Sequence, residues 1–217
     1  MTQELVPGVH GESDLIEIAT RLACEGYWED IKQVMEVSRV FRYDEQLWDA
    51  MKDVPGVGTR KKTRLAYAVH INDLERVRFL LARGARVSKA NVYGATPLHY
   101  ASSLEVVREL CKGGADVNAA MTTDGTTPLM KASENGHLEV VRELCKRGAT
   151  VNAASVSGRT PLMFASCLGH SAVVSLLLDR GASKTAVSNF GETAFTVACG
   201  KSGSEATKTS LQTLLRI

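Results

Sequence analysis

The chain has 217 residues, 44% of them hydrophobic and 23% charged, a composition that excludes extensive disorder and allows one large domain or two small ones. No apolar run approaches the roughly 20 residues of a membrane-spanning helix, and residues 1–14 carry acids where a secretory signal carries basic residues. The formal charge of +2 hides an asymmetry: residues 1–57 carry 5 Lys/Arg and 12 Asp/Glu, a balance of −7, whereas residues 58–217 carry 21 and 12, a balance of +9.

Cysteine usage predicts a reducing compartment. The chain has five cysteines, an odd number, and none of them stands in a Cys-x-x-Cys pair. The sequence also contains no Asn-x-Ser/Thr glycosylation acceptor. We therefore expect the cytoplasm, with the nucleus as the alternative location.

Residues 1–57 are predicted to form a helical cap. Residues 22–35 carry apolar positions at helical spacing around a short turn, and a second apolar set predicts one further helix that ends near Pro55-Gly56. Aromatic residues are concentrated in this part of the chain, which favours the packing of a small helical domain. They are Tyr27, Trp28, Phe41, Tyr43 and Trp48.

From Thr63 onward the sequence repeats itself. Threonines that open similar phrases stand 33, 31, 33 and 33 residues apart, at Thr63, Thr96, Thr127, Thr160 and Thr193. A Gly-Ala pair keeps step with them, and its glycines are Gly84, Gly114, Gly148 and Gly181. A further glycine series follows the same period, at Gly94, Gly125, Gly158 and Gly191.

The third unit shows the structure that each phrase predicts. Thr127 is placed to cap a helix, and Pro128 occupies the first helical position, where its missing N–H costs nothing. Asn135-Gly136 ends this short helix, and apolar residues at helical spacing then predict a second, antiparallel helix that stops at Gly148. The small and polar residues 152–158 predict a projecting turn or β-hairpin finger.

These phrases, such as Thr96-Pro97-Leu98-His99-Tyr100-Ala101, resemble the ankyrin repeat, whose signature is Thr-Pro-Leu-His-x-Ala, a Gly-His turn and a Gly-Ala end. The resemblance implies an all-α repeat solenoid of stacked helix-turn-helix units with β-hairpin or finger loops. Residues 58–217 would hold repeats 63–94, 95–125, 126–158 and 159–191 and a C-terminal capping repeat, 192–217. Residues 1–57 would be an N-terminal cap made of a degenerate ankyrin-like helix pair plus one helix. One such unit cannot bury its apolar face alone, so neighbours must stack.

The second unit departs from this pattern. Thr96 and Leu104 are eight residues apart, whereas the equivalent Thr127 and Leu138 are eleven apart, so the Gly-His turn is missing. The finger that follows is one residue longer than the others, and residues 121–124 should bulge. Tolerated drift in a loop explains the change; a shifted stacking angle or a partner contact is the alternative.

The sequence predicts no catalytic, cofactor or metal site. Gly56 to Thr63 and Gly200-Lys201-Ser202 imitate a phosphate-binding loop, but neither fits its spacing. Cys111 and Cys145 stand where sister units have Leu81 and Leu178, so we expect buried thiols in a core role. The remaining candidates, His99, His137 and His170, match family positions where histidine makes structural hydrogen bonds, and nothing clusters as zinc ligation or Cys-His catalysis requires.

We therefore expect a non-catalytic interaction module or scaffold that binds a protein on its concave face. In the ankyrin family the inner face of the first helices and the finger tips usually contact the partner. The matching inner-helix positions are Tyr100, Ser103, Lys131, Glu134, Asn135, Phe164, Cys167 and Leu168. The matching finger positions are Lys89, Asn91, Tyr93, Met121, Thr123, Asp124, Ser155, Ser157, Ser188, Asn189 and Phe190. Exposed aromatics dominate binding energy, which favours Tyr93, Tyr100, Phe164 and Phe190.

Two other functions stay open. The N-terminal residues resemble an F-box, which implies a substrate-recruiting adaptor of a ubiquitin ligase; the residues are Ala19, Leu22, Trp28, Val34, Phe41, Leu47 and Trp48. Basic residues between Arg60 and Arg86 favour a solvated face or an acidic protein partner. Nucleic acid or an anionic membrane is the weaker choice, because the repeats offer neither a clear interleaving of aromatic residues for stacking on bases nor a helix clearly aimed at a groove.

Overall fold

The computed structural model of the chain describes residues 63–200 and 213–215. The predicted N-terminal cap, with its aromatic cluster and F-box-like residues, lies outside the described residues. So do both phosphate-loop-like segments, apart from Thr63 and Gly200, and residues 201–212 of the predicted C-terminal cap.

The described residues form a run of short helices in pairs. The first helix of each pair has seven residues, except in the second repeat, and the second helix has nine. In chain order they are α4 (Arg64–His70), α5 (Leu74–Ala82), the 3-10 helix η1 (Pro97–Tyr100), α6 (Leu104–Lys112), α7 (Pro128–Glu134), α8 (Leu138–Lys146), α9 (Pro161–Cys167), α10 (Ser171–Asp179) and α11 (Ala194–Gly200).

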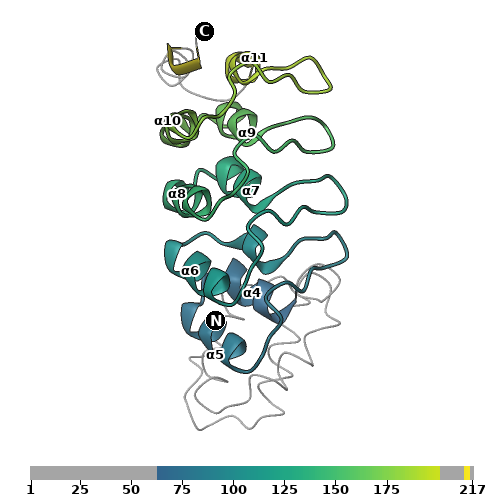
Figure 1. The fold of residues 1–217 in the computed structure, drawn as a ribbon, viewed down its shortest axis with the longest axis vertical. Coiled ribbons are helices and arrows are strands. Elements are labelled where there is room, and N and C mark those ends of the chain that lie inside the picture. The colour runs from purple at the N-terminus through teal and green to yellow at the C-terminus, as the bar shows by residue number, and fades with distance from the viewer. Residues whose placement is uncertain (1–62, 201–212, 216–217) are drawn as a thin grey trace, which may run out of the picture. The chain divides into compact units, whose positions relative to one another are not determined.

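The helices and loops of the described repeats lie in three columns (Figure 1). The first helices η1, α7, α9 and α11 contact one another in the middle column. The second helices α5, α6, α8 and α10 contact one another in the outer column, and the fingers project on the opposite side. This is the all-α stack of helix-turn-helix units that the repeats predict.

Capping residues begin and end the helices where the sequence predicts. Thr127 Oγ1 accepts a hydrogen bond from the Met130 N–H, and Thr160 Oγ1 accepts one from the Met163 N–H. Each of these threonines is followed by a proline at the first helical position. Gly148 has φ +85°, the left-handed conformation that ends a helix at little cost in glycine.

One apolar core runs through all the described repeats. Its largest fully buried side chains come in equivalent positions of successive units: Leu129, Met130, Leu162 and Met163 from the first helices, and Leu110, Leu144 and Leu177 from the second. They belong to one cluster that continues from repeat to repeat, so each unit needs its neighbours to bury its apolar face. Leu215 is buried in the same core, as expected of a C-terminal cap.

The fingers are closed by tight turns and linked to one another by backbone hydrogen bonds. The N–H of Thr122 donates to Tyr93 O, that of Val156 to Asp124 O, and that of Asn189 to Ser157 O. Within residues 63–200 these fingers contain no assigned strand, so they are turns rather than paired β-strands.

The bulge predicted for residues 121–124 is confirmed. The Gly125 N–H donates to Met121 O, four residues back, whereas the Gly158 N–H donates to Ser155 O, three residues back. The extra residue is therefore accommodated as a wider turn at the finger tip.

The second repeat is shortened on its inner side only. Its first helix is the four-residue 3-10 helix η1, whereas α7 and α9 each have seven residues. The chain leaves η1 in extended conformation at Ala101, and Ser103 then caps α6 by accepting a hydrogen bond from the Val106 N–H. The loss of the Gly-His turn is thus confined to the end of the first helix and leaves α6 at full length.

No helix within residues 63–200 and 213–215 is long and apolar enough to cross a bilayer.

Candidate protein-binding surface

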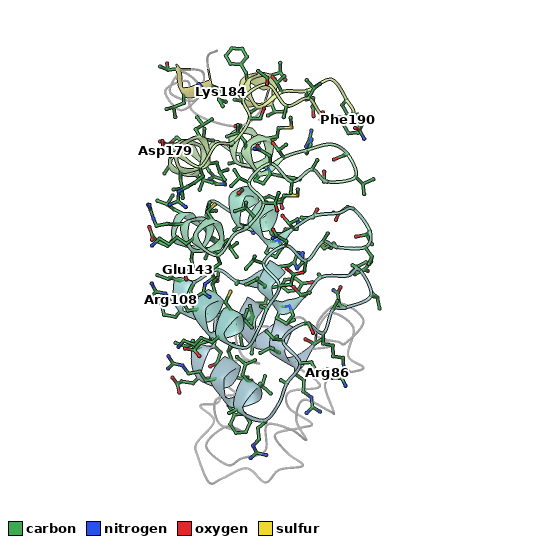
Figure 2. All side chains as sticks on the ribbon, in the orientation of Figure 1. Arg86, Arg108, Glu143, Asp179, Lys184 and Phe190 are labelled. Carbon is green, nitrogen blue, oxygen red and sulfur yellow. The ribbon has the colours of Figure 1, made fainter. Side chains whose placement is uncertain are left out.

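The finger tips present exposed side chains along the side of the stack that is opposite the outer helices. Phe190 is 72% exposed and Tyr93 is 39% exposed. Figure 2 shows Phe190 on the last described finger, on the other side of the stack from Arg108 and Glu143. The other predicted finger residues that are exposed are Lys89, Thr123, Asp124 and Asn189. These positions are exposed, and their contact with a partner stays a prediction.

Two predicted finger contacts are corrected by the structure. Ser155 is only 8% exposed and Ser188 only 5%. Ser188 Oγ accepts hydrogen bonds from the N–H groups of Phe190 and Glu192, and Ser155 Oγ accepts one from the Arg159 N–H. A short hydroxyl side chain at this position folds back onto its own turn, so both serines hold the finger in shape and offer little surface to a partner.

Three further finger residues are half-buried. Asn91 occupies the same position as the two serines, and its Oδ1 accepts from the N–H groups of Tyr93 and Ala95. Ser157 bonds Ser155 through the two hydroxyls, at 2.9 Å. Met121 lies at the base of the widened turn and lines a hollow that is described below.

The inner-helix candidates are mostly half-buried. Asn135 and Leu168 are exposed, and Tyr100, Ser103, Lys131, Glu134, Phe164 and Cys167 are half-buried. Ser103 is used as a helix cap, and Lys131 Nζ lies 2.8 Å from Glu134 Oε2. Tyr100 and Phe164 each line a hollow.

Two hollows are formed between the fingers and the inner helices, each of about 510 Å³. The aromatic hollow lies between the third and fourth repeats and the last finger. It is lined by Thr123, Asp124, Thr126, Ser155, Val156, Ser157, Phe164, Asn189 and Phe190. It brings together Phe164 and Phe190, two of the four aromatic residues that the sequence favours as contacts.

The basic hollow lies next to the shortened repeat. It is lined by His70, Ala95, His99, Tyr100, Ala101, Ser102, Met121, Lys131, Asn135 and His137. The His70 ring packs edge-on against Tyr100 with centroids 5.9 Å apart. Tyr100 is also fixed by Asn91, whose Nδ2 donates to its hydroxyl oxygen at 3.1 Å.

Sequence reasoning missed several residues of these hollows. Val156 is 70% exposed at a finger tip, and His70 and His137 line the basic hollow. Val156 stands two residues before Gly158, an outward position that the finger period itself reveals. The histidines gave no such signal, because they come together only where the shortened repeat leaves room.

His99 makes the structural hydrogen bonds that the sequence predicts. Its Nδ1 accepts from the Thr96 N–H at 3.1 Å, so this nitrogen carries no proton and Nε2–H donates to Thr126 O at 3.0 Å. Burial lowers the pKa of His99 below its usual value of 6.5, because an imidazolium would lose its water there. The ring is a neutral link from the second repeat to the third.

His170 and His137 differ, although they are equivalent residues. His170 Nε2–H donates to Glu134 O at 2.8 Å, as predicted. The imidazole of His137 makes no hydrogen bond within the described residues, so the prediction is wrong for this histidine. Burial and the nearby His170 lower the pKa of His137.

The cysteines are less buried than predicted. Cys111 and Cys145 are half-buried at the edge of the core, as are their counterparts Leu81 and Leu178. Their burial raises the pKa of both thiols, which keeps them protonated and poorly nucleophilic. No group of His, Cys, Asp and Glu within the described part of the chain is arranged to hold a metal ion.

Charged residues on the outer helices are largely paired with one another. Arg78 Nη2 lies 3.6 Å from Glu109 Oε1, and Arg108 Nε lies 4.0 Å from Glu143 Oε1, on α6 and α8 in Figure 2. Both arginine side chains are 50% exposed, so solvent screens these pairs and they contribute little to stability. They do neutralise part of the basic charge on that side.

Comparison with known proteins agrees with the geometry. The family model for ankyrin repeats (3 copies) matches residues 42–121 and 113–188. No curated protein matches the chain. Ankyrin repeats generally mediate protein–protein interaction, and the family is generally non-catalytic. Since the matched residues make up more than half of the sequence and the described residues form the expected stack, the chain belongs to the ankyrin repeat family.

Proposed function

We propose that this chain is a non-catalytic module or scaffold that binds a protein partner on the surface formed by its fingers and inner helices. The supporting observation is the exposure of Phe190 next to the aromatic hollow. A phenylalanine that is 72% exposed contributes little to the core, yet it stands beside Phe164 and Val156 at the mouth of a ready-made hollow. Clustered exposed apolar side chains of this kind mark protein-binding sites.

Neighbouring apolar side chains extend this surface along the fingers. Val92 and Tyr93 occupy the first finger tip, in the same positions as Asn189 and Phe190 in the last one. Both are exposed. A partner that lies across the fingers would therefore meet apolar side chains at both ends, with the polar Thr123 and Asp124 between them.

The test is affinity capture from the source cells with the full chain as bait. Phe190→Ala and Phe164→Ala are compared with Phe79→Ala, a matched control because Phe79 is an exposed aromatic on the outer helix α5. We expect Phe190→Ala and Phe164→Ala each to lower the affinity for a specific partner about thirtyfold, as for a hot-spot aromatic that contributes about 2 kcal/mol to binding. The control should retain it. Identical partner lists for all baits would overturn the proposal.

A further inference from the structure

The basic hollow exists because three residues are missing from the second repeat. Aligned on Thr96 and Thr127, the second repeat runs from Ser102 directly to Ser103, where the third repeat has Ser133, three more residues and His137. The three are Glu134, Asn135 and Gly136, which end α7 and form the turn to α8. The second repeat therefore lacks the end of its first helix and the whole turn.

In the regular part of the stack this space is filled. His170 lies so close to the turn of the preceding repeat that a Cβ added at Gly136 would come 2.6 Å from its Nδ1. Its Nε2–H donates to Glu134 O at 2.8 Å. The histidine thus seals the junction between the third and fourth repeats.

His137 is the same residue one repeat earlier, and its partner has been deleted. It is half-buried, and within the described residues its imidazole donates to and accepts from no group. Neither ring nitrogen is among the fully buried unpaired atoms of the described residues, so both can be reached by a group that enters the hollow. The ring faces the space that the missing turn would fill.

The walls of this space suit an anion. Lys131 and Asn135 reach it from the end of α7, and His137 from the start of α8. Lys131 has three N–H donors, and Glu134 is the only acceptor that they meet within the described residues. None of the residues that line the hollow is an Asp or a Glu.

The remaining walls suit a side chain rather than a free ion. Ala95, Ala101, Met121 and the ring of Tyr100 form an apolar collar around the donors. A carboxylate on an aliphatic stem satisfies both features, since its oxygens accept from Lys131 and His137 while its methylenes contact the collar.

We propose that the hollow left by the shortened repeat is a specificity pocket for the carboxylate side chain of an Asp or Glu in the protein partner. This rests on the proposed function, because it assumes that the partner lies on the same face of the stack. The partner's acid replaces the deleted turn: it gives His137 the acceptor that His170 has, and it accepts a second hydrogen bond from Lys131, whose first goes to Glu134.

The decisive variant fills the pocket and leaves Lys131 and His137 themselves unchanged. It inserts Glu-Asn-Gly between Ser102 and Ser103 and carries Ser103→His, so that the second repeat matches the third. A second variant, Lys131→Met, removes the cation. Lys112→Met is its control, since Lys112 is an exposed lysine on the outer helix α6 that also forms an i,i+3 ion pair with a glutamate. Circular dichroism and urea unfolding check that each variant is folded.

The probe is a phage-displayed library of random peptides of about 12 residues, selected on the full chain. We expect an enriched motif with a fixed Asp or Glu. Changing that acid to its amide should weaken binding about tenfold or more, as for a lost charge-assisted hydrogen bond. Lys131→Met should weaken the binding of the acidic peptide to a similar degree, whereas Lys112→Met should leave it unchanged. The filled variant should bind the acidic peptide and its amide counterpart equally well.

Failure of this inference can be told apart from failure of the proposed function. The pocket alone would be overturned by peptides whose binding depends on Phe190 but that carry no fixed acid. Peptides that bind the filled variant as tightly as the original chain would overturn it too. A phosphoserine peptide that binds through Lys131 while its glutamate counterpart does not would also overturn it. A library without any binder would count against both.

Discussion

The second and third repeats contain the same nine residues, LEVVRELCK, at Leu104–Lys112 and Leu138–Lys146. Both copies form full-length α-helices, α6 and α8, with the equivalent valines and leucine buried. What precedes them differs: a four-residue 3-10 helix and a cap by Ser103 in one repeat, a seven-residue α-helix and a Gly-His turn in the other.

This contrast shows that the outer and inner sides of an ankyrin unit are largely independent. The apolar face of the second helix packs on its neighbours in the outer column regardless of how the chain arrives there. The three-residue deletion is therefore absorbed on the inner side, where it leaves a hollow and a histidine without its usual acceptor.

The largest effect is expected from truncating the core leucines of the identical helices. Leu110 and Leu144 are both fully buried, so Leu110→Ala and Leu144→Ala should each lower the free energy of unfolding by about 2–5 kcal/mol. We expect the smaller loss at Leu110, because the shortened inner helix beside it can shift to fill a cavity. Urea unfolding of the full chain measures both. A larger loss at Leu110 would show that the shortened repeat is the more tightly packed.

The next largest effect is expected at the turn that the second repeat lacks. Gly136→Ala should cost about 2–3 kcal/mol, because its φ is +71° and the added methyl group would displace His170 from Glu134 O. Gly114→Ala is the control: its φ is +84° but no atom lies within 4 Å of the added group, so only the strain of about 1 kcal/mol remains. Thermal or urea unfolding distinguishes them, and equal losses would mean that His170 does not seal the junction.

A smaller effect is expected from the asparagines that join successive repeats. Asn118 Nδ2 donates to Gly148 O and its Oδ1 accepts from the Thr150 N–H, and Asn152 makes the same two bonds to Gly181 and Ser183. Asn118→Ala and Asn152→Ala should each cost about 1–2 kcal/mol. Because these bonds lie away from the deletion, the two losses should be equal in urea unfolding. Unequal losses would mean that the deletion disturbs more than the inner side.

The smallest effect concerns pH. The pKa of His99 is lowered in the folded state, so the unfolded chain binds more protons below the usual histidine pKa of 6.5. The stability that neutral His99 contributes is therefore present above that pH and is lost as the pH falls toward the folded-state pKa. His99→Met copies Met130 of the third repeat and should reduce the loss of stability between about pH 7.5 and pH 5.5. Urea unfolding at both pH values measures this, and an unchanged loss would assign it to other groups, such as His137.

Most of the fold could be predicted from local signals. Threonine-proline pairs that begin helices, glycines that end them and the spacing of apolar residues all act within a few residues. The helix pairs, the fingers and the bulge at residues 121–124 are therefore found where the sequence predicts them. The candidate site could be predicted only in part. Finger tips such as Tyr93 and Phe190 are exposed, but Ser155 and Ser188 are buried because their hydroxyls bond the turn itself.

The identical helices separate what the sequence determines from what tertiary structure decides. The nine residues determine an amphipathic helix with the same buried face in both repeats, because helix formation and apolar patterning are local. Their ion pairs with the preceding repeat are alike, Arg78 with Glu109 and Arg108 with Glu143, because the two arginines are equivalent residues. The pairs within each unit differ, Lys112 with Glu109 but Arg147 with Glu143, because the residue after the second helix is Gly113 in one repeat and Arg147 in the other.

The same holds for the basic hollow. The short spacing between Thr96 and Leu104 indicates that a turn is missing. Whether neighbouring residues fill the space of that turn depends on how the adjacent repeats pack. Only the packed structure shows that it stays open beside Lys131 and His137. Local sequence decides which elements form, and contacts between repeats decide which of their side chains find a partner within the stack and which stay open to solvent.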